Sequence, residues 1–307
     1  MSRKDKNHEA EMNDGRHTLR RSLEQGEFAI TVEMNPPKGT NVSALLETTK
    51  ALVGHVHGIN VTDNTAAVMR ASSVAVSRLL FEQGHDPVLQ VTCRDRNRMG
   101  IQSDLLGAHL LGIRNVLCLT GDSPQVGDHK EAKPVYDMDS VQVMRTIGLL
   151  NQGRDMADKP LDGATDFFIG AATAPGVDPA DIMHQKLSAK VQAGAQFFQT
   201  QAVYCSDSFK GFMLEVRRYP CKILAGVLVL RSLKMAEYLN ANIPGIDVPE
   251  ELLLEMKDAG GFHEADVGVD IAVRLIKAVR PYCDGVHIMP GRLGDRVPEI
   301  IRKAELN

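Results

Sequence analysis

Short apolar runs rich in β-branched residues recur along this chain, and helical patterns fill the stretches between them. Eight runs are predicted as strands: 28–34, 56–62, 86–92, 113–120, 166–172, 195–201, 221–229 and 284–290. Eight alternations in 307 residues are typical of the α/β class and of a (β/α)8 TIM barrel. An open doubly wound sheet is the alternative. No G-x-G-x-x-G follows any run, which weakens its dinucleotide-binding version.

The helical patterns give the same domain organisation. They cover 42–54, 70–84, 100–112, 140–153, 178–194, 206–219, 232–240, 249–258, 265–282 and a final stretch beginning at Val297. No low-complexity linker divides them, so we expect one barrel domain over 27–307. Residues 1–26 are expected to be a flexible polar segment with a first helix. The charged opening has no apolar core, so we expect neither a signal peptide nor a convincing anchor in it.

The composition excludes several function classes. A net charge of −4, 5% aromatic residues and no tryptophan argue against nucleic acid as a partner. No apolar run reaches the roughly 18 residues of a membrane span. The five cysteines include no C-x-x-C pair, which favours reduced thiols in the cytoplasm.

Polar residues at the ends of the predicted strands are the candidate site, because barrel chemistry gathers at the carboxyl ends of strands. In "FAITVEMNPPKG", Glu33 ends the first strand before two prolines, and such a carboxylate costs free energy unless something uses it. Asp122 follows the fourth strand in "LTGDSP", although a turn role remains open for it. Gln199 and Gln201 share one face of the sixth strand, where buried amides need partners.

The sequence offers no nucleophile or metal centre of its own. The histidines, His287 among them, are scattered and form no H-E-x-x-H, and there is no P-loop. No Ser–His pair stands out either. A site of this kind usually takes its chemistry from a cofactor, which composition does not name.

Six motifs fall in an order that resembles the methylenetetrahydrofolate reductases. They are "VEMNPPKG", "NVTDN", "VTC", "LTGDSP", "KVQAGAQFFQTQ" and "AGVL", and the resemblance runs from about Phe28 to Met289. The closing "GVHIMPG…VPEII" is more similar to the short reductases of acetogens and related bacteria.

The resemblance implies a flavin-bearing (β/α)8 barrel that reduces 5,10-methylenetetrahydrofolate to 5-methyltetrahydrofolate in one-carbon metabolism. It implies FAD as the cofactor and NADH or NADPH as the electron donor. Glu33 would be the general acid in opening the folate ring, and Asp122 a fixed negative charge near flavin and pterin. The implied cofactor contacts are Thr62, Gln90, Thr120, Gly121, Asp122, Tyr136 and Lys190, and Gln201 would contact the substrate.

Some positions depart from the family pattern and keep alternatives open. Gln90 stands where a histidine is common, and Thr120 where an arginine precedes Gly-Asp. FMN in place of FAD and an electron-delivering partner subunit, in a homo- or hetero-oligomer, are therefore alternatives. So are a flavin-free folate-binding barrel of methyltransferase or lyase type and a folate-binding subunit of a larger redox complex. Arg94, Arg231 and Arg292 are candidates for the glutamate tail of folate.

Overall fold

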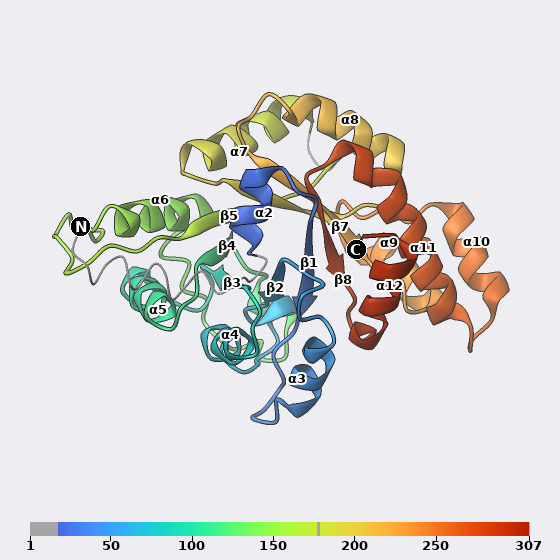
Figure 1. The fold of residues 1–307 in the computed structure, drawn as a ribbon, viewed down its shortest axis with the longest axis horizontal. Helices are drawn as coiled ribbons and strands as arrows, with labels where there is room; N and C mark the ends of the chain where they lie inside the picture. The colour runs from blue at the N-terminus through green and yellow to red at the C-terminus, as the bar shows by residue number, and fades with distance from the viewer. Residues whose placement is uncertain (1–17, 177–178, 307) are drawn as a thin grey trace.

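In the computed structural model, which describes residues 18–176 and 179–306, eight parallel strands close into a barrel in sequence order (Figure 1). The strands are β1 (Ala29–Met34), β2 (Gly58–Val61), β3 (Pro87–Thr92), β4 (Asn115–Leu119), β5 (Phe168–Thr173), β6 (Phe197–Ala202), β7 (Lys222–Leu228) and β8 (Gly285–Met289). Each lies within or overlaps one predicted run. The predicted (β/α)8 barrel is confirmed.

Helices surround the strands (Figure 1). They are α2 (Leu19–Gln25), α3 (Ser43–Lys50), α4 (Ser73–Glu82), α5 (Arg98–Leu110), α6 (Ser140–Asn151), α7 (Ala180–Gln192), α8 (Ser206–Val216), α9 (Leu233–Asn242), α10 (Glu250–Ala259), α11 (Glu264–Val279) and α12 (Val297–Lys303). Helix α7 begins at Ala180 inside the predicted 178–194, of which Asp178 lies outside the described residues. Within the described residues no helix has the length and apolar character to cross a membrane.

Local chemistry decides where several of these helices begin. In α6, Asp139 accepts a hydrogen bond from the backbone N–H of Gln142, and the Gln142 side chain accepts one from the N–H of Asp139. This capping box satisfies two amides that the helix itself leaves without partners. Asn97 caps α5 in a similar way, at the end of the loop that leaves β3.

Helix α2 closes the end of the barrel at which the strands begin. Leu19 and Leu23 are fully buried, and the backbone N–H of Leu19 donates to the Asp86 carboxylate at 2.9 Å, just before β3. We call the apolar cluster at this end the plug: Leu19, Leu23, Ala29, Val88, Leu117, Phe168, Phe197 and Leu224. The first helix predicted within 1–26 is therefore part of the barrel core. Residues 1–17 of that segment lie outside the described residues.

Two aromatic rings fill the centre of the plug. Phe168 and Phe197 stack with their centroids 5.0 Å apart. A Cβ at Gly170 would lie 2.2 Å from the Phe197 ring, so only glycine leaves room for it. Side chains thus fill the barrel interior at the end where the strands begin, as they do in closed eight-stranded barrels.

Candidate active site

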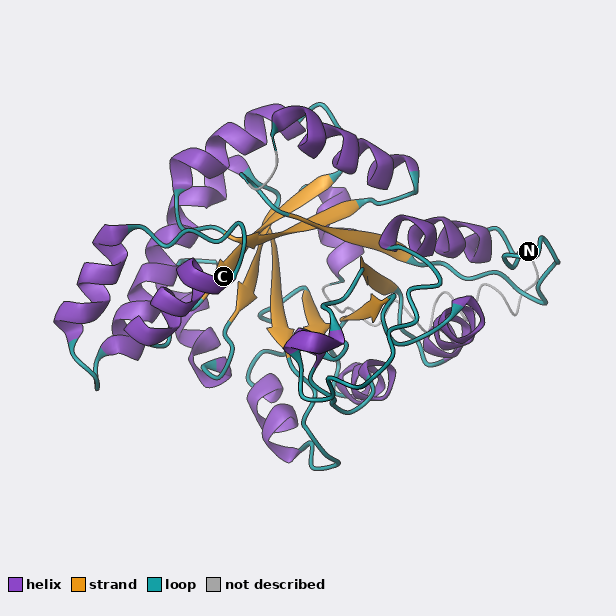
Figure 2. Cartoon of the chain, turned by 180° about the vertical axis from the view of Figure 1, so that it is seen from behind, coloured by secondary structure: helices purple, strands orange, loops and turns teal. Residues whose placement is uncertain are grey.

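The strands finish and the loops gather at the opposite end of the barrel (Figure 2). A cavity of about 390 Å³ lies there, lined by residues of the strand ends and of the loops that follow them. Its lining includes Glu33, Asp63, Asn64, Gln90, Thr92, Arg94, Thr120, Gly121, Asp122, Gln199, Thr200, Gln201, His287 and Met289. A second cavity of about 260 Å³ adjoins it, since Ala172 and Gln201 line both. We call the first the mouth cavity and the second the side cavity. The mouth cavity has the size typical of small-molecule sites, roughly 300–1,000 Å³.

Glu33 projects into the mouth cavity from the inner face of β1. Side chains alternate along a strand, so Ala29, Thr31 and Glu33 share that face. The Glu33 side chain is 23% exposed. Its Oε2 lies 3.5 Å from Nε2 of Gln90 and 3.8 Å from Nε2 of His287. The carboxyl group therefore faces the cavity with an amide and an imidazole beside it.

A buried polar layer separates Glu33 from the plug. Gln199 donates to Thr31 Oγ1 at 3.1 Å and to Asn60 Oδ1 at 3.0 Å, and it accepts from Asn60 Nδ2 at 2.7 Å. Thr31 Oγ1 lies 3.0 Å from Nδ1 of His287. All four residues are at most 3% exposed. Because these buried groups are paired, the layer is stable and holds the imidazole in place below Glu33.

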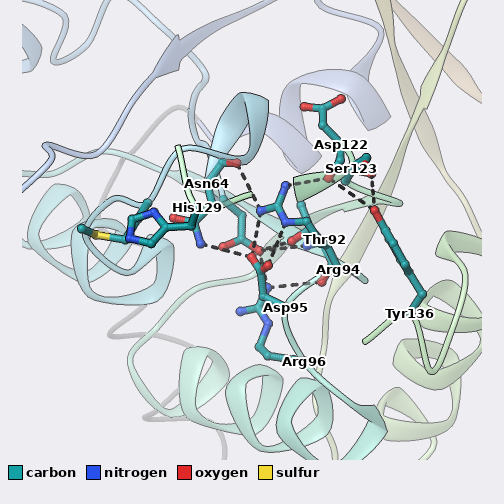
Figure 3. Close-up of polar contacts among 12 residues, drawn as sticks. Asn64, Thr92, Arg94, Asp95, Arg96, Asp122, Ser123, His129 and Tyr136 are labelled. Atoms are coloured by element: carbon teal, nitrogen blue, oxygen red, sulfur yellow. Dashed lines mark hydrogen bonds and ion pairs between the residues drawn. The ribbon is translucent and has the colours of Figure 1, made fainter. Parts of the chain in front are cut away.

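The loop after β4 fixes Asp122 at the rim of the mouth cavity. The Asp122 carboxylate is exposed and accepts a hydrogen bond from the backbone N–H of Ala66 at 3.1 Å. The Tyr136 hydroxyl donates to the carbonyls of Gly121 and Asp122 at 3.2 and 3.3 Å (Figure 3). Gly121 has φ +88°, and a Cβ there would lie 3.0 Å from Cβ of Thr92. Glycine therefore allows the loop to pass close to β3.

Arg94 ties three loops together beneath this rim. Its side chain is 3% exposed, and it donates to the Asp95 carboxylate, the Asn64 carbonyl and the Asp122 carbonyl (Figure 3). The hydrogen bond to Asp95 raises the pKa of Arg94 above its usual value, so the charge is permanent. Because these guanidinium donors are engaged within the protein, Arg94 acts as a structural cation here rather than as a free cation for a folate tail.

A second ion pair, in which the Asp63 carboxylate is buried and Arg96 is partly exposed, supports the same loops. Asp63 accepts hydrogen bonds from the backbone N–H and the hydroxyl of Thr92, both at 2.9 Å, and it pairs with Arg96. Arg96 also donates to Asp104 at 2.9 Å. The polar groups at the ends of β2 and β3 are thus locked to each other, which gives the cavity a rigid wall.

The thiol at the end of β3 is not activated, and the described residues form no metal site. Burial raises the pKa of the Cys93 thiol, at the end of β3, to about 11, so that thiol stays protonated near neutral pH. Across residues 18–176 and 179–306, no three His, Cys, Asp or Glu side chains are grouped as a metal site.

Comparison with known sequences identifies the family. The sequence model of the methylenetetrahydrofolate reductase family matches residues 18–305. This chain belongs to that family. Methylenetetrahydrofolate reductase 2 of Schizosaccharomyces pombe is 27% identical over 247 residues, which cover 74% of this chain and 36% of the yeast protein. A 5,10-methylenetetrahydrofolate reductase of Pectobacterium carotovorum is 23% identical over 277 residues, or 85% of each chain.

The chain is much shorter than its eukaryotic relatives, whereas its fold matches one solved structure over nearly the whole chain. The chain spans about a third of the length of the eukaryotic reductases: 36% of the yeast protein and 28% of a probable methylenetetrahydrofolate reductase (NADPH) of Caenorhabditis elegans. Among solved structures, an uncharacterized Clostridium thermocellum protein that binds two copies of 5-methyl-5,6,7,8-tetrahydrofolic acid has a TM-score of 0.66. It is 15% identical and covers 94% of this chain and 98% of its own, which is a likeness of fold.

The residues implied by the reductase family fall into two groups in this structure. The mouth cavity brings together Glu33, Gln90, Thr120, Gly121, Asp122 and Gln201, and the side cavity has Lys190 on its wall. Lys190 Nζ donates to the Ala172 carbonyl at 2.7 Å. Thr62 is fully buried and bonded to Asn35, and Tyr136 lies outside both linings. Arg231 and Arg292 are exposed and also lie outside them.

Two features of this site were missed from the sequence. His287 was placed among scattered histidines, yet it lies on the inner face of β8 beside Glu33. The sequence did contain a signal for this position. His287 lies two residues before Met289, and side chains alternate along a strand, so both lie on the same face of β8. Asn60 was missed as the partner of Gln199, because that pair joins β2 to β6 across the barrel.

Proposed function

We propose that this chain is a flavin-dependent methylenetetrahydrofolate reductase, with Glu33 as general acid and Asp122 as an electrostatic stabiliser. One observation carries the proposal: Glu33, Asp122 and Gln201, from three different strand ends, line a single cavity in a barrel of this family. Active sites of such barrels are assembled from several strand ends in this way.

The residues present fit a bound flavin. The ring system would be held at the mouth cavity by Gln90, Thr120 and Gly121, and a phosphate would find Lys190 and Lys186 on the wall of the side cavity. Flavin, when bound, supplies the hydride. FAD is the cofactor named by the resemblance, and FMN is the alternative. NADH or NADPH would be the electron donor, or else a partner subunit.

Glu33 suits the role of proton donor. Ring opening of the folate produces a cationic iminium and requires a proton at a folate nitrogen, which a positioned carboxyl can give. The carboxyl stands on a strand rather than a loop, with Gln90 and His287 at 3.5 and 3.8 Å to orient it. A donor held on a rigid element keeps its geometry through the reaction.

Asp122 suits the role of a fixed charge. Its carboxylate is tied to the N–H of Ala66, while Arg94 and Tyr136 hold its carbonyl. A negative charge that is already in place stabilises a cation without reorganisation when the cation forms.

A second function is favoured by the structural neighbour. The Clostridium thermocellum protein of similar fold binds two copies of 5-methyl-5,6,7,8-tetrahydrofolic acid. A flavin-free barrel that binds folate, or a folate-binding subunit of a larger redox complex, is therefore the competing proposal.

The experiment is to purify the protein, record its visible spectrum, and mix the reduced form with 5,10-methylenetetrahydrofolate without oxygen. A bound flavin whose absorbance returns on mixing, with 5-methyltetrahydrofolate as product, is the expected result. A colourless protein that takes up neither FAD nor FMN, yet binds 5-methyltetrahydrofolate, would establish the competing function. Flavin reduction by NADH and by NADPH, compared under the same conditions, identifies the electron donor. Failure of both nucleotides to reduce the flavin favours a partner subunit as the donor.

A further inference from the structure

Strand β6 carries an irregularity just below the mouth cavity. Its register against β7 runs Phe198 to Ile223 and Gln199 to Leu224, and then Ala202 to Gly226. Three steps along β6 therefore match two steps along β7, which is a β-bulge with one extra residue. On its other side β6 keeps a regular register with β5 through Thr200.

The hydroxyl of Thr200 fills the gap that the bulge leaves. Its Oγ1 accepts a hydrogen bond from the backbone N–H of Gly226 at 2.8 Å and donates to the carbonyl of Gln201 at 2.8 Å. The strand pairing resumes at Val203, whose N–H donates to the Gly226 carbonyl at 2.9 Å. The single Thr200 hydroxyl thus takes the place of a backbone partner for the Gly226 N–H on β7 and for the Gln201 carbonyl on β6.

Gly226 shows how tightly the bulge is packed. A Cβ there would lie 2.2 Å from the Thr200 carbonyl oxygen and 2.8 Å from that of Gln201. Only glycine lets the two backbones approach this closely. The close packing of the β6 and β7 backbones at Gly226 therefore holds the bulge in place.

The bulge decides where the Gln201 amide lies. Gln201 lines both the mouth cavity and the side cavity, and its buried Oε1 accepts no hydrogen bond from the described residues. Gln199, two residues earlier on the same strand, has partners for both amide atoms. A buried acceptor without a partner costs free energy that a ligand N–H can recover.

We infer that Thr200 is a positioning residue, whose hydroxyl holds the bulge that presents Oε1 of Gln201 to an N–H donor of the bound pterin. The inference rests on the proposed function, because it takes folate as the ligand. Thr200 acts through Gln201 and the backbone and has no role in proton transfer.

The test is titration calorimetry of 5-methyltetrahydrofolate into the flavin-loaded protein. Thr200→Val keeps the shape of the side chain but loses the hydroxyl, and we expect its affinity to fall about tenfold, the scale of one lost hydrogen bond. Thr200→Ser keeps the hydroxyl and should stay within about twofold of the wild type. Flavin content should be unchanged in both variants.

A double-mutant cycle separates positioning from a general loss of structure. Gln201→Met alone should also weaken binding about tenfold, and adding Thr200→Val should weaken it no further, because both changes remove the same contact. A second full loss in the double variant, or unchanged affinity in Thr200→Val, overturns the inference. Should Thr200→Val fail to fold, Thr200→Cys takes its place, and wild-type affinity there overturns the inference as well. If the wild type binds no folate, the proposed function itself is wrong and the inference falls with it.

Discussion

The two ends of the barrel interior are built from the same strands and have opposite character. On β1 the inner face runs from Ala29 in the plug through Thr31 in the polar layer to Glu33 at the mouth. On β6 it runs from Phe197 through Gln199 to Gln201. Within five residues, each strand thus passes from a buried apolar side chain to a partly exposed polar one. The closed end stabilises the fold, and the open end is left free for chemistry.

Cavity volume alone does not distinguish these ends. A cleft of about 650 Å³, larger than the mouth cavity, lies at the plug end beside Glu24, Tyr219 and Tyr282. Burial raises the pKa of its Cys221 and Cys283 to about 11, so both thiols stay protonated. The strand residues that line this cleft, Phe168, Lys222 and Ile223, lie at strand beginnings, whereas barrel chemistry is assembled at strand ends. The convergence of polar side chains, rather than the space, marks the site.

Removing an aromatic ring should break the closed end. Phe197→Ala deletes a fully buried side chain, and we expect the free energy of unfolding to fall by about 3–5 kcal/mol. Urea denaturation measures this, with Leu110→Ala as a control because Leu110 is 86% exposed on α5. The control should change stability by less than about 0.5 kcal/mol. Equal, small losses in the two variants would contradict a plug that carries the stability.

Breaking the polar layer should cost less. Gln199→Met leaves the buried Asn60 amide without its partner, and we expect a loss of about 1–3 kcal/mol in the same denaturation experiment. Adding Asn60→Leu removes the orphaned group, so the double variant should lose less than the sum of the two single variants. Additive losses would mean that the two amides do not depend on each other.

The smallest effect concerns pH and belongs to the closed end. Burial lowers the pKa of His85, which is 3% exposed with Nε2 3.0 Å from the Thr49 carbonyl, before the start of β3. The unfolded chain takes up a proton at a pKa of about 6.5 while the folded state resists it. Stability should therefore fall as pH drops below about 6.5, by at most about 1.4 kcal/mol per pH unit for one proton. His85→Gln should flatten this dependence, and identical slopes between pH 7 and 5 would contradict the assignment.

The sequence predicted the elements well and the contacts between distant elements poorly. Strand ends such as Glu33 and Gln201 could be read from local alternation and turn residues. The pair of Glu33 with His287 could not, because β1 and β8 meet only when the barrel closes. The charged sequence around Arg94 is typical of a solvent-exposed loop. The structure instead buries Arg94 among residues of three loops. Leu23, in a segment predicted as polar, likewise finds its partners only in the closed barrel.

The most direct test of the account is the folate half-reaction of Glu33→Gln, measured by stopped flow. The variant is reduced with dithionite and mixed with 5,10-methylenetetrahydrofolate, with Glu47→Gln on the exposed face of α3 as the matched control. The account predicts that flavin reoxidation slows at least about 100-fold in Glu33→Gln, the scale of a lost general acid, while flavin content, unfolding free energy and the control remain at wild-type values. Reoxidation of Glu33→Gln at the wild-type rate would contradict it.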